Sequence, residues 1–172
     1  MAPRTDTFDL PRLGLTSGEG RKLDLHVHLD GFEFGAQKYA VAPAEVPARM
    51  DVSRMTGSGW ALRLRFTASL HGPCARCLEP AGPTFEVDSR EVHVPGSGEE
   101  LASPYVDAEE VLDLEQWAHD ALALALPGTI VCKPECLGLC AECGVDLNEA
   151  PGHEHEREPD QRWAKLSELK FD

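Results

Sequence analysis

The chain has 172 residues, with 16 Lys and Arg against 30 Asp and Glu, which gives a formal charge of −14. This length corresponds to about one domain and buries about 70% of the unfolded surface, so a core requires neither disulfides nor metals. A hydrophobic content of 42% excludes wholesale disorder. Because no apolar run reaches signal-peptide or membrane-spanning length, we expect a cytoplasmic protein without membrane contact.

The charge is concentrated in the second half of the chain. Residues 1–90 hold 11 basic and 11 acidic side chains, whereas residues 91–172 hold 5 basic and 19 acidic ones. Such a half would repel a phosphate backbone and attract a basic protein. The alternative is a solvated acidic face without a partner.

Alternating hydrophobicity predicts strands in the first half. After an irregular lead-in over residues 1–22, apolar and polar residues alternate from 23 to 30, and Gly31 predicts a bulge before the pattern resumes at Phe32. Residues 36–58 are ambiguous. A strong strand pattern covers 60–70, and a second strand with a parity slip covers 85–94 on the far side of a C-x-x-C turn.

Helical spacing appears after an acidic loop over residues 95–106. Asp113 is the expected cap, Leu114, Trp117 and Ala121 recur on one face, and Pro127 ends the helix. Because residues 121–126 are apolar all round, we expect a largely buried helix. A short terminal helix is predicted over 162–170.

These elements predict an α+β fold. We expect a curved, mostly antiparallel, barrel-like sheet with a covering helix in a core domain at 1–130. A Cys-rich, zinc-binding segment and the terminal helix, at 131–172, are expected to pack on that core.

The six cysteines carry the sharpest chemical signal, because tight clusters in a reducing compartment are more often metal ligands than disulfides. They fall as Cys74-x2-Cys77 and Cys132-x3-Cys136-x3-Cys140-x2-Cys143. A two-residue gap lets a short turn aim both thiolates at one zinc ion. A thioredoxin-like function is disfavoured, because Pro80 and Pro83 deny the first pair a following helix.

The histidines His153 and His155 raise the number of soft ligands to eight, enough for two tetrahedral zinc ions. One partition gives the first ion Cys74, Cys77, Cys132 and Cys136, and the second ion Cys140, Cys143, His153 and His155. A rival partition gives one ion Cys132, Cys136, Cys140 and Cys143 and leaves Cys74 and Cys77 to pair elsewhere. A separate alternative for His153 and His155 is a solvated linker without a metal. Either shell leaves no open position, so the expected zinc is structural.

Catalytic motifs are missing from the sequence. It contains no nucleotide-binding, zinc-protease or nucleophile-elbow motif. Zinc deaminases need H-x-E before P-C-x-x-C, whereas the segment HEHE here follows the cysteines. The nearest fragment, PCARC at 73–77, has His71 before it but no H-x-E. We therefore expect a protein that is not an enzyme.

The composite of motifs resembles the YceD family, the large ribosomal RNA subunit accumulation proteins of bacteria and plastids. The matching pieces are CARCLEP at 74–80, LEQWAHDALALALP at 114–127, VCKPECLGLCAECGVDLN at 131–148 and DQRWAKLSELK at 160–170. The resemblance implies a non-enzymatic role in the accumulation of large-subunit (23S) ribosomal RNA during ribosome assembly. Relatives in this family often carry Cys-x-Cys where this chain has His153-x-His155.

Two hypotheses about partners follow. In the first, the protein binds precursor ribosomal RNA through the basic stretch that holds Arg49, Arg54, Arg63, Arg65 and Arg76. In the second, it is an acidic chaperone or adaptor for a basic large-subunit ribosomal protein and does not touch RNA. Salt-dependent RNA binding by the isolated protein discriminates between the two. The alternative to RNA contact for Arg63 and Arg65 is pairing with acids on a neighbouring strand, such as Glu86 or Asp88.

Overall fold

The structure, a computed structural model, describes residues 5–96, 98 and 100–155. The chain divides into two compact units, residues 1–136 and 137–172. The helix expected over 162–170 lies outside the described residues. Within the described part, no helix combines the length and apolarity that a membrane crossing requires.

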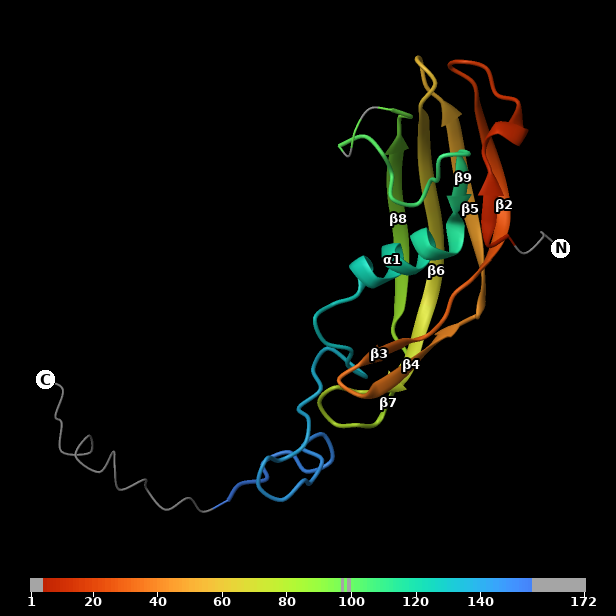
Figure 1. The fold of residues 1–172 in the computed structure, drawn as a ribbon. Helices are drawn as coiled ribbons and strands as arrows, with labels where there is room; N and C mark the ends of the chain where they lie inside the picture. Colours follow the sequence, from red (N-terminus) through yellow and green to blue (C-terminus); the bar gives the residue numbers. More distant parts are fainter. Residues whose placement is uncertain (1–4, 97, 99, 156–172) are drawn as a thin grey trace, which may run out of the picture. The chain divides into compact units, whose positions relative to one another are not determined.

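The first unit is built on one antiparallel sheet (Figure 1). Its strand order is β2-β5-β6-β4-β3, and β7 and β8 also pair with β6. The strands are β2 (Gly20–His28), β3 (Phe32–Phe34), β4 (Gln37–Ala42), β5 (Glu45–Arg54), β6 (Trp60–Pro73), β7 (Pro80–Ala81) and β8 (Thr84–His93). A separate pair joins β1 (Thr7–Asp9) to β9 (Val111–Asp113), and the helices are η1 (Pro11–Leu13) and α1 (Leu114–Ala125).

Strand β6 confirms the strongest sequence pattern. The apolar residues of its alternation are all buried, namely Trp60, Leu62, Leu64, Phe66, Ala68 and Leu70. The parity slip predicted for β8 is wrong. Its pairing with β6 is uninterrupted from Thr84 to His93, so Val92 is 41% exposed and His93 faces the core.

The ambiguous residues 36–58 form β4 and β5. Strand β5 buries Val46, Ala48, Met50 and Val52, a clear alternation that Pro47 obscures. Proline is tolerated there because the pairing of β5 with β6 begins only at Ala48. The predicted bulge at Gly31 is also wrong, since β2 ends at His28 and β3 is a separate strand paired with β4.

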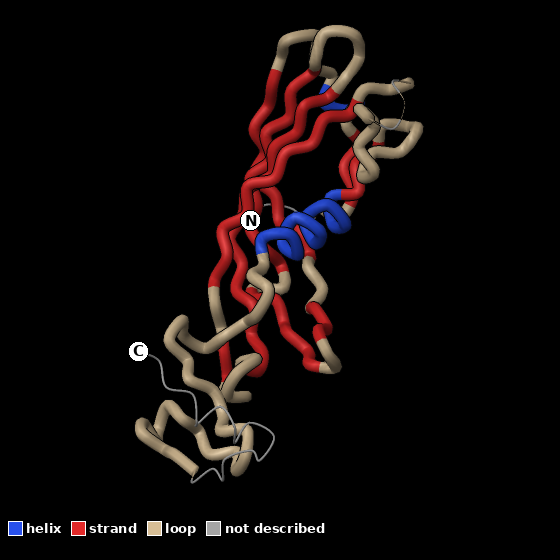
Figure 2. The backbone as a smooth tube through the Cα atoms, turned by 90° about the vertical axis from the view of Figure 1, so that its left-hand side faces the viewer, coloured by secondary structure: helices blue, strands red, loops and turns tan. Residues whose placement is uncertain are grey.

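The sheet does not close into the expected barrel. Strands β2 and β8 lie at its two edges and do not pair with each other. A closed barrel whose interior side chains can fill takes roughly eight strands, and only four run side by side here. Helix α1 lies across one face of the sheet instead and supplies the second layer of the core (Figures 1 and 2).

The start of α1 is fixed by two capping arrangements. As predicted, the Asp113 side chain accepts a hydrogen bond from the Gln116 backbone N–H at 2.9 Å. In addition, the carbonyl oxygen of Asp6 accepts from the backbone N–H groups of Leu114 and Glu115 at 2.9 and 3.0 Å. Three N–H groups that a helix start leaves without partners are thereby satisfied.

Only one side of α1 is buried, which corrects the expectation of a largely buried helix. Leu114, Trp117 and Leu122 are almost fully buried, whereas Leu124 is 87% exposed. A helix on one face of a sheet turns about 100° per residue and must present its other side to solvent.

The described part of the second unit, residues 137–155, contains neither helix nor regular strand. It is held by an isolated bridge between Leu139 and Asp146 and by a bond from the Leu147 N–H to the Gly138 carbonyl at 2.9 Å. A side-chain bond, from the Leu137 N–H to Asn148 Oδ1, spans 3.0 Å. This unit therefore has little core of its own, which leaves metal ligation as a source of order.

The two sides of α1 predict unequal effects of the same change, leucine to alanine. Leu122→Ala should lower the free energy of unfolding by about 2–5 kcal/mol, because it leaves a cavity in the core. Leu124→Ala, two residues away and exposed, should change it by less than about 0.5 kcal/mol. Urea unfolding followed by circular dichroism measures both, and equal losses would contradict the observed orientation of the helix.

Candidate metal centres

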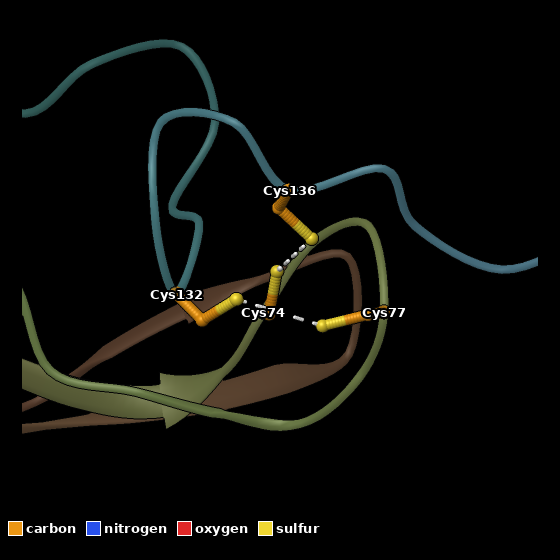
Figure 3. Close-up of side chains that lie close together, drawn as sticks. All are labelled: Cys74, Cys77, Cys132 and Cys136. Carbon is orange, nitrogen blue, oxygen red and sulfur yellow. Dashed lines mark hydrogen bonds between the residues drawn. The ribbon is translucent and has the colours of Figure 1, made fainter. Parts of the chain in front are cut away.

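Four cysteine sulfurs converge in the first unit. Cys74 and Cys77 lie in the turn after β6, and Cys132 and Cys136 lie in the loop after α1 (Figure 3). The four Sγ atoms lie within 4.8 Å of one another, with 3.8 Å from Cys74 to Cys136 and 3.7 Å from Cys77 to Cys132. These separations exclude disulfides, whose S–S bond is about 2.05 Å. They match the spacing of about 3.8 Å between sulfurs placed 2.3 Å from a tetrahedral zinc.

The first C-x-x-C turn has a defined backbone geometry. The Cys74 N–H donates to the carbonyl of Glu79 at 2.8 Å, and the Leu78 N–H donates to the carbonyl of Cys74 at 3.0 Å. The turn is completed by Leu78 in the left-handed region, at a φ of 66°. The Arg76 N–H points at the Cys74 sulfur at 3.4 Å, as expected for a thiolate ligand.

The loop after α1 is attached to this turn by main-chain contacts. The Ala75 N–H donates to the Ile130 carbonyl at 2.8 Å, and the Arg76 guanidinium donates to the Cys136 carbonyl at 2.8 Å. Cys74, Cys77 and Cys136 are buried, while Cys132 is exposed. The cluster therefore joins the end of the central strand to a segment more than 50 residues further along the chain.

The second unit holds a similar group of four ligands. Cys140 Sγ lies 3.2 Å from His155 Nε2, and Cys143 Sγ lies 3.2 Å from His153 Nε2. The two Nε2 atoms are 2.9 Å apart, and all four ligand atoms lie within 4.8 Å of one another. The structure thus groups the residues in the eight-ligand partition and not in the rival one.

The second C-x-x-C turn repeats the backbone of the first. The Cys140 N–H donates to the Val145 carbonyl at 2.8 Å, and the Gly144 N–H donates to the Cys140 carbonyl at 2.9 Å. Gly144 occupies the left-handed position, at a φ of 74°. The two turns are distant in sequence but have the same backbone geometry. We infer that each presents two sulfurs to one ion.

A carboxylate that the sequence reasoning missed lies behind one histidine. Glu142 Oε2 is 3.6 Å from Nδ1 of His155, whose Nε2 points at the cluster. Metal-bound histidines commonly direct their other ring nitrogen to a carboxylate, which fixes the ring orientation. The only sequence signal is the position of Glu142 inside the C-x-x-C turn.

The thiols of the first cluster ionise unequally. Burial disfavours the thiolate of Cys74, but backbone N–H donors of Cys77, Arg76 and Cys132 lower its pKa to about 6. At Cys77 the Glu79 N–H favours the thiolate, yet burial and the neighbouring sulfurs raise the pKa to about 12. One thiolate forms readily, and the later ones need the positive charge of a metal ion.

The second cluster also favours one thiolate. Backbone N–H groups of Cys143 and Glu142 lower the pKa of Cys140 to about 6, against a smaller opposing effect of burial. Each cluster thus has soft ligands, the four ligands of a tetrahedral site and a stabilised thiolate, so both clusters fit a zinc ion.

The arginines predicted to contact RNA are engaged with protein groups. Ion pairs join Arg49 to Asp24 at 3.0 Å, Arg63 to Asp88 at 2.5 Å, Arg65 to Asp51 at 2.6 Å and Arg54 to Glu110 at 3.5 Å. The Arg54 guanidinium also lies 4.3 Å from the centre of the Trp60 ring. The pairing on the sheet surface includes the contact with Asp88 that the sequence analysis raised as an alternative to RNA contact.

The two clusters predict a metal content and unequal effects on stability. Purified, reduced protein should contain two zinc ions per chain. Of the two variants Cys74→Ser and His153→Ala, the first should lower the melting temperature more. The reason is that the first cluster crosslinks the core unit and structural zinc contributes on the order of 10 kcal/mol. Elemental analysis and thermal unfolding measure both quantities. Less than about half an ion per chain would refute metal binding, and equal losses would refute this assignment of roles.

The contact behind His155 predicts a milder effect. Glu142→Gln should weaken zinc binding at the second cluster about tenfold, because the ring loses the carboxylate that orients it. Glu149→Gln removes an equal charge from the same unit, where Glu149 is exposed, and should leave the affinity unchanged. Competition with a chromophoric chelator measures both; equal affinities of the two variants would show that Glu142 does not act through the histidine.

Comparison with known proteins places these motifs in a family. The family model described as "Large ribosomal RNA subunit accumulation protein YceD" matches residues 62–170. Uncharacterized proteins of Mycobacterium tuberculosis and Mycobacterium bovis are 35% identical over 171 residues, covering 95% of this chain and 80% of theirs. An uncharacterized Mycobacterium leprae protein is 38% identical over 109 residues, covering 60% of this chain and 49% of its own. No solved structure matches. Since the family match spans both C-x-x-C turns and helix α1, the chain belongs to the YceD family.

Proposed function

We propose that this protein is a non-enzymatic factor that supports the accumulation of large-subunit (23S) ribosomal RNA in the cytoplasm, and that its two clusters hold structural zinc. The observation that carries the proposal is the family match over residues 62–170, which includes the ligand-bearing turns. A reducing cytoplasm, where bacterial ribosomes assemble, keeps such thiols available for a metal.

A structural role for the metals is supported by the number of protein ligands. Each cluster offers four, which completes a tetrahedral zinc shell and leaves no position for water or substrate. In the first cluster the ion would fix the loop after α1 to the end of β6. In the second it would order a unit whose described part lacks regular secondary structure.

The polar groups around α1 also have structural tasks. Asp113 caps the helix, Asp120 accepts hydrogen bonds from Tyr105 and Gln116, and the Trp117 indole N–H donates to Ser89 at 2.9 Å. These bonds satisfy polar groups in and beside the core, as folded proteins require. In the proposed role these groups serve the fold, and none of them is assigned a catalytic task.

The ion pairs of the sheet favour an adaptor for a basic protein over direct RNA contact. Arg63 donates to both carboxylate oxygens of Asp88 and thereby lowers the pKa of that carboxyl. Phosphate contact would have to break this pair and the pair of Arg65 with Asp51. Among the described acids of the second half, Glu110 pairs with Arg54, but no Lys or Arg occurs between Arg90 and Lys133 to neutralise the acids of that stretch locally.

Complementation tests the proposal and separates its two forms. In a bacterial strain lacking its own YceD protein, the wild-type chain should restore the ratio of 23S to 16S ribosomal RNA, and Cys74→Ser should not. The double variant Arg63→Ala with Arg65→Ala should restore it fully, because these arginines serve the sheet. Failure of the wild type to change the ratio would refute the function. Failure of the folded double variant alone would indicate RNA contact.

A further inference from the structure

An apolar hollow of about 480 Å³ opens on the first unit. It is formed where the β3–β4 hairpin, the end of α1 and the first C-x-x-C turn meet. Its apolar walls are Phe34, Tyr39, Ala75, Ala123, Leu126 and Ile130. None of the residues that line it carries a charge.

The walls of the hollow are held in place. Phe34 is 44% exposed, yet its ring centre lies 5.6 Å from that of Phe32 and 5.7 Å from that of Tyr39. The Tyr39 hydroxyl donates to the carbonyl of Pro73 at 2.9 Å. The opposite wall is fixed by the bond from the Ala75 N–H to Ile130. Because the ring is already held in place, packing against a partner would cost little further side-chain entropy.

The other end of α1 carries an acidic hollow of about 400 Å³. Four carboxylates line it, those of Asp30, Asp113, Glu115 and Asp120, with no lysine or arginine among the lining residues. His119, which also lines it, stacks on Phe32 at 4.4 Å between ring centres. The apolar and acidic hollows therefore lie at successive positions along α1. The apolar hollow includes Phe34 of β3, and the acidic hollow includes Asp30, which precedes β3.

An apolar hollow next to an acidic one restricts the kind of molecule that can bind along α1. An RNA strand would meet four carboxylates and be repelled. A second copy of this chain, with a formal charge of −14, would meet the same repulsion. A protein segment with one large apolar side chain followed by lysines or arginines complements both hollows.

We propose that the two hollows act together as one groove along α1 and bind a basic segment of a partner protein, with the apolar side chain in the hollow beside Phe34 and the basic ones beside Glu115. That the partner is a ribosomal protein rests on the proposed function. The groove itself rests on the structure. Because Ala75 and Ile130 lie next to the first cluster, the metal there would also shape one wall of the groove.

A labelled peptide tests the groove without any ribosomal component. The probe is a fluorescein-labelled peptide of about ten residues, with a leucine near one end followed by lysines and alanines. Fluorescence anisotropy with the purified, zinc-loaded chain should show binding that weakens about tenfold when the peptide leucine is replaced by serine. Added salt should weaken it further, since the basic half is held by charge.

Matched variants locate the binding. Ala123→Arg should weaken binding about tenfold, because it fills the hollow and adds positive charge, and arginine is compatible with the helix. Leu124→Arg, the same change on the neighbouring exposed residue, should bind as wild type. Glu115→Gln should weaken binding and its salt dependence, whereas Glu109→Gln, an equal change at an exposed loop position, should alter neither.

Several outcomes would overturn the proposal. The first is peptide binding of equal affinity with and without the leucine, and the second is an equal loss of affinity in Ala123→Arg and Leu124→Arg. The third is displacement of the peptide by an RNA oligonucleotide. The fourth is a dimer of this chain that Ala123→Arg dissociates. If Ala123→Arg lowers the melting temperature, Phe34→Ala serves as a second variant. It removes a wall of the hollow and must give the same loss of peptide affinity. Since no ribosomal RNA is present, failure here leaves the complementation result untouched, and failure of complementation leaves this binding result untouched.

Discussion

The continuous strand β6 is the element on which the rest of the first unit depends. It pairs with β5 and β8 in its first part and with β4 and β7 toward its end, so this one strand positions four others. The residue after its last position is Cys74. The first two sulfurs of the buried cluster are therefore presented by the most highly connected part of the sheet, and an ion there would transmit this rigidity to the loop that follows α1.

The two C-x-x-C turns solve one geometric problem in different settings. Both place a residue with positive φ directly after the second cysteine, glycine in the exposed turn and Leu78 in the other. A non-glycine residue in this conformation costs about 1–2 kcal/mol, which the surrounding sheet and the ligation of Cys74 and Cys77 would offset. The second turn has no such surroundings within its unit and uses the residue that adopts the conformation without strain.

The charges of the first unit are arranged in two contrasting ways. On the sheet, Arg63 and Arg65 are neutralised by neighbouring carboxylates, so the strand arginines stabilise the cross-strand surface. Along α1, by contrast, Asp30 and Glu115 share an acidic hollow with no lysine or arginine in its lining. An acidic hollow of this kind attracts basic groups, and this is the chemistry on which the proposed binding of a basic segment rests.

Local patterns in the sequence determined the strong strand at 60–70, the Asp113 cap and the eight candidate ligands, because these depend on alternation, on a single side chain and on spacing. Which four ligands lie together was open between two partitions and came from tertiary structure. The open sheet, the unbroken register of β8 and the half-exposed helix came from tertiary structure, since they depend on which strands are neighbours and which face is already covered. The same holds for Asp6, which caps α1 from more than 100 residues away. No periodicity encodes such a contact, because it arises only when folding brings two remote backbone segments together.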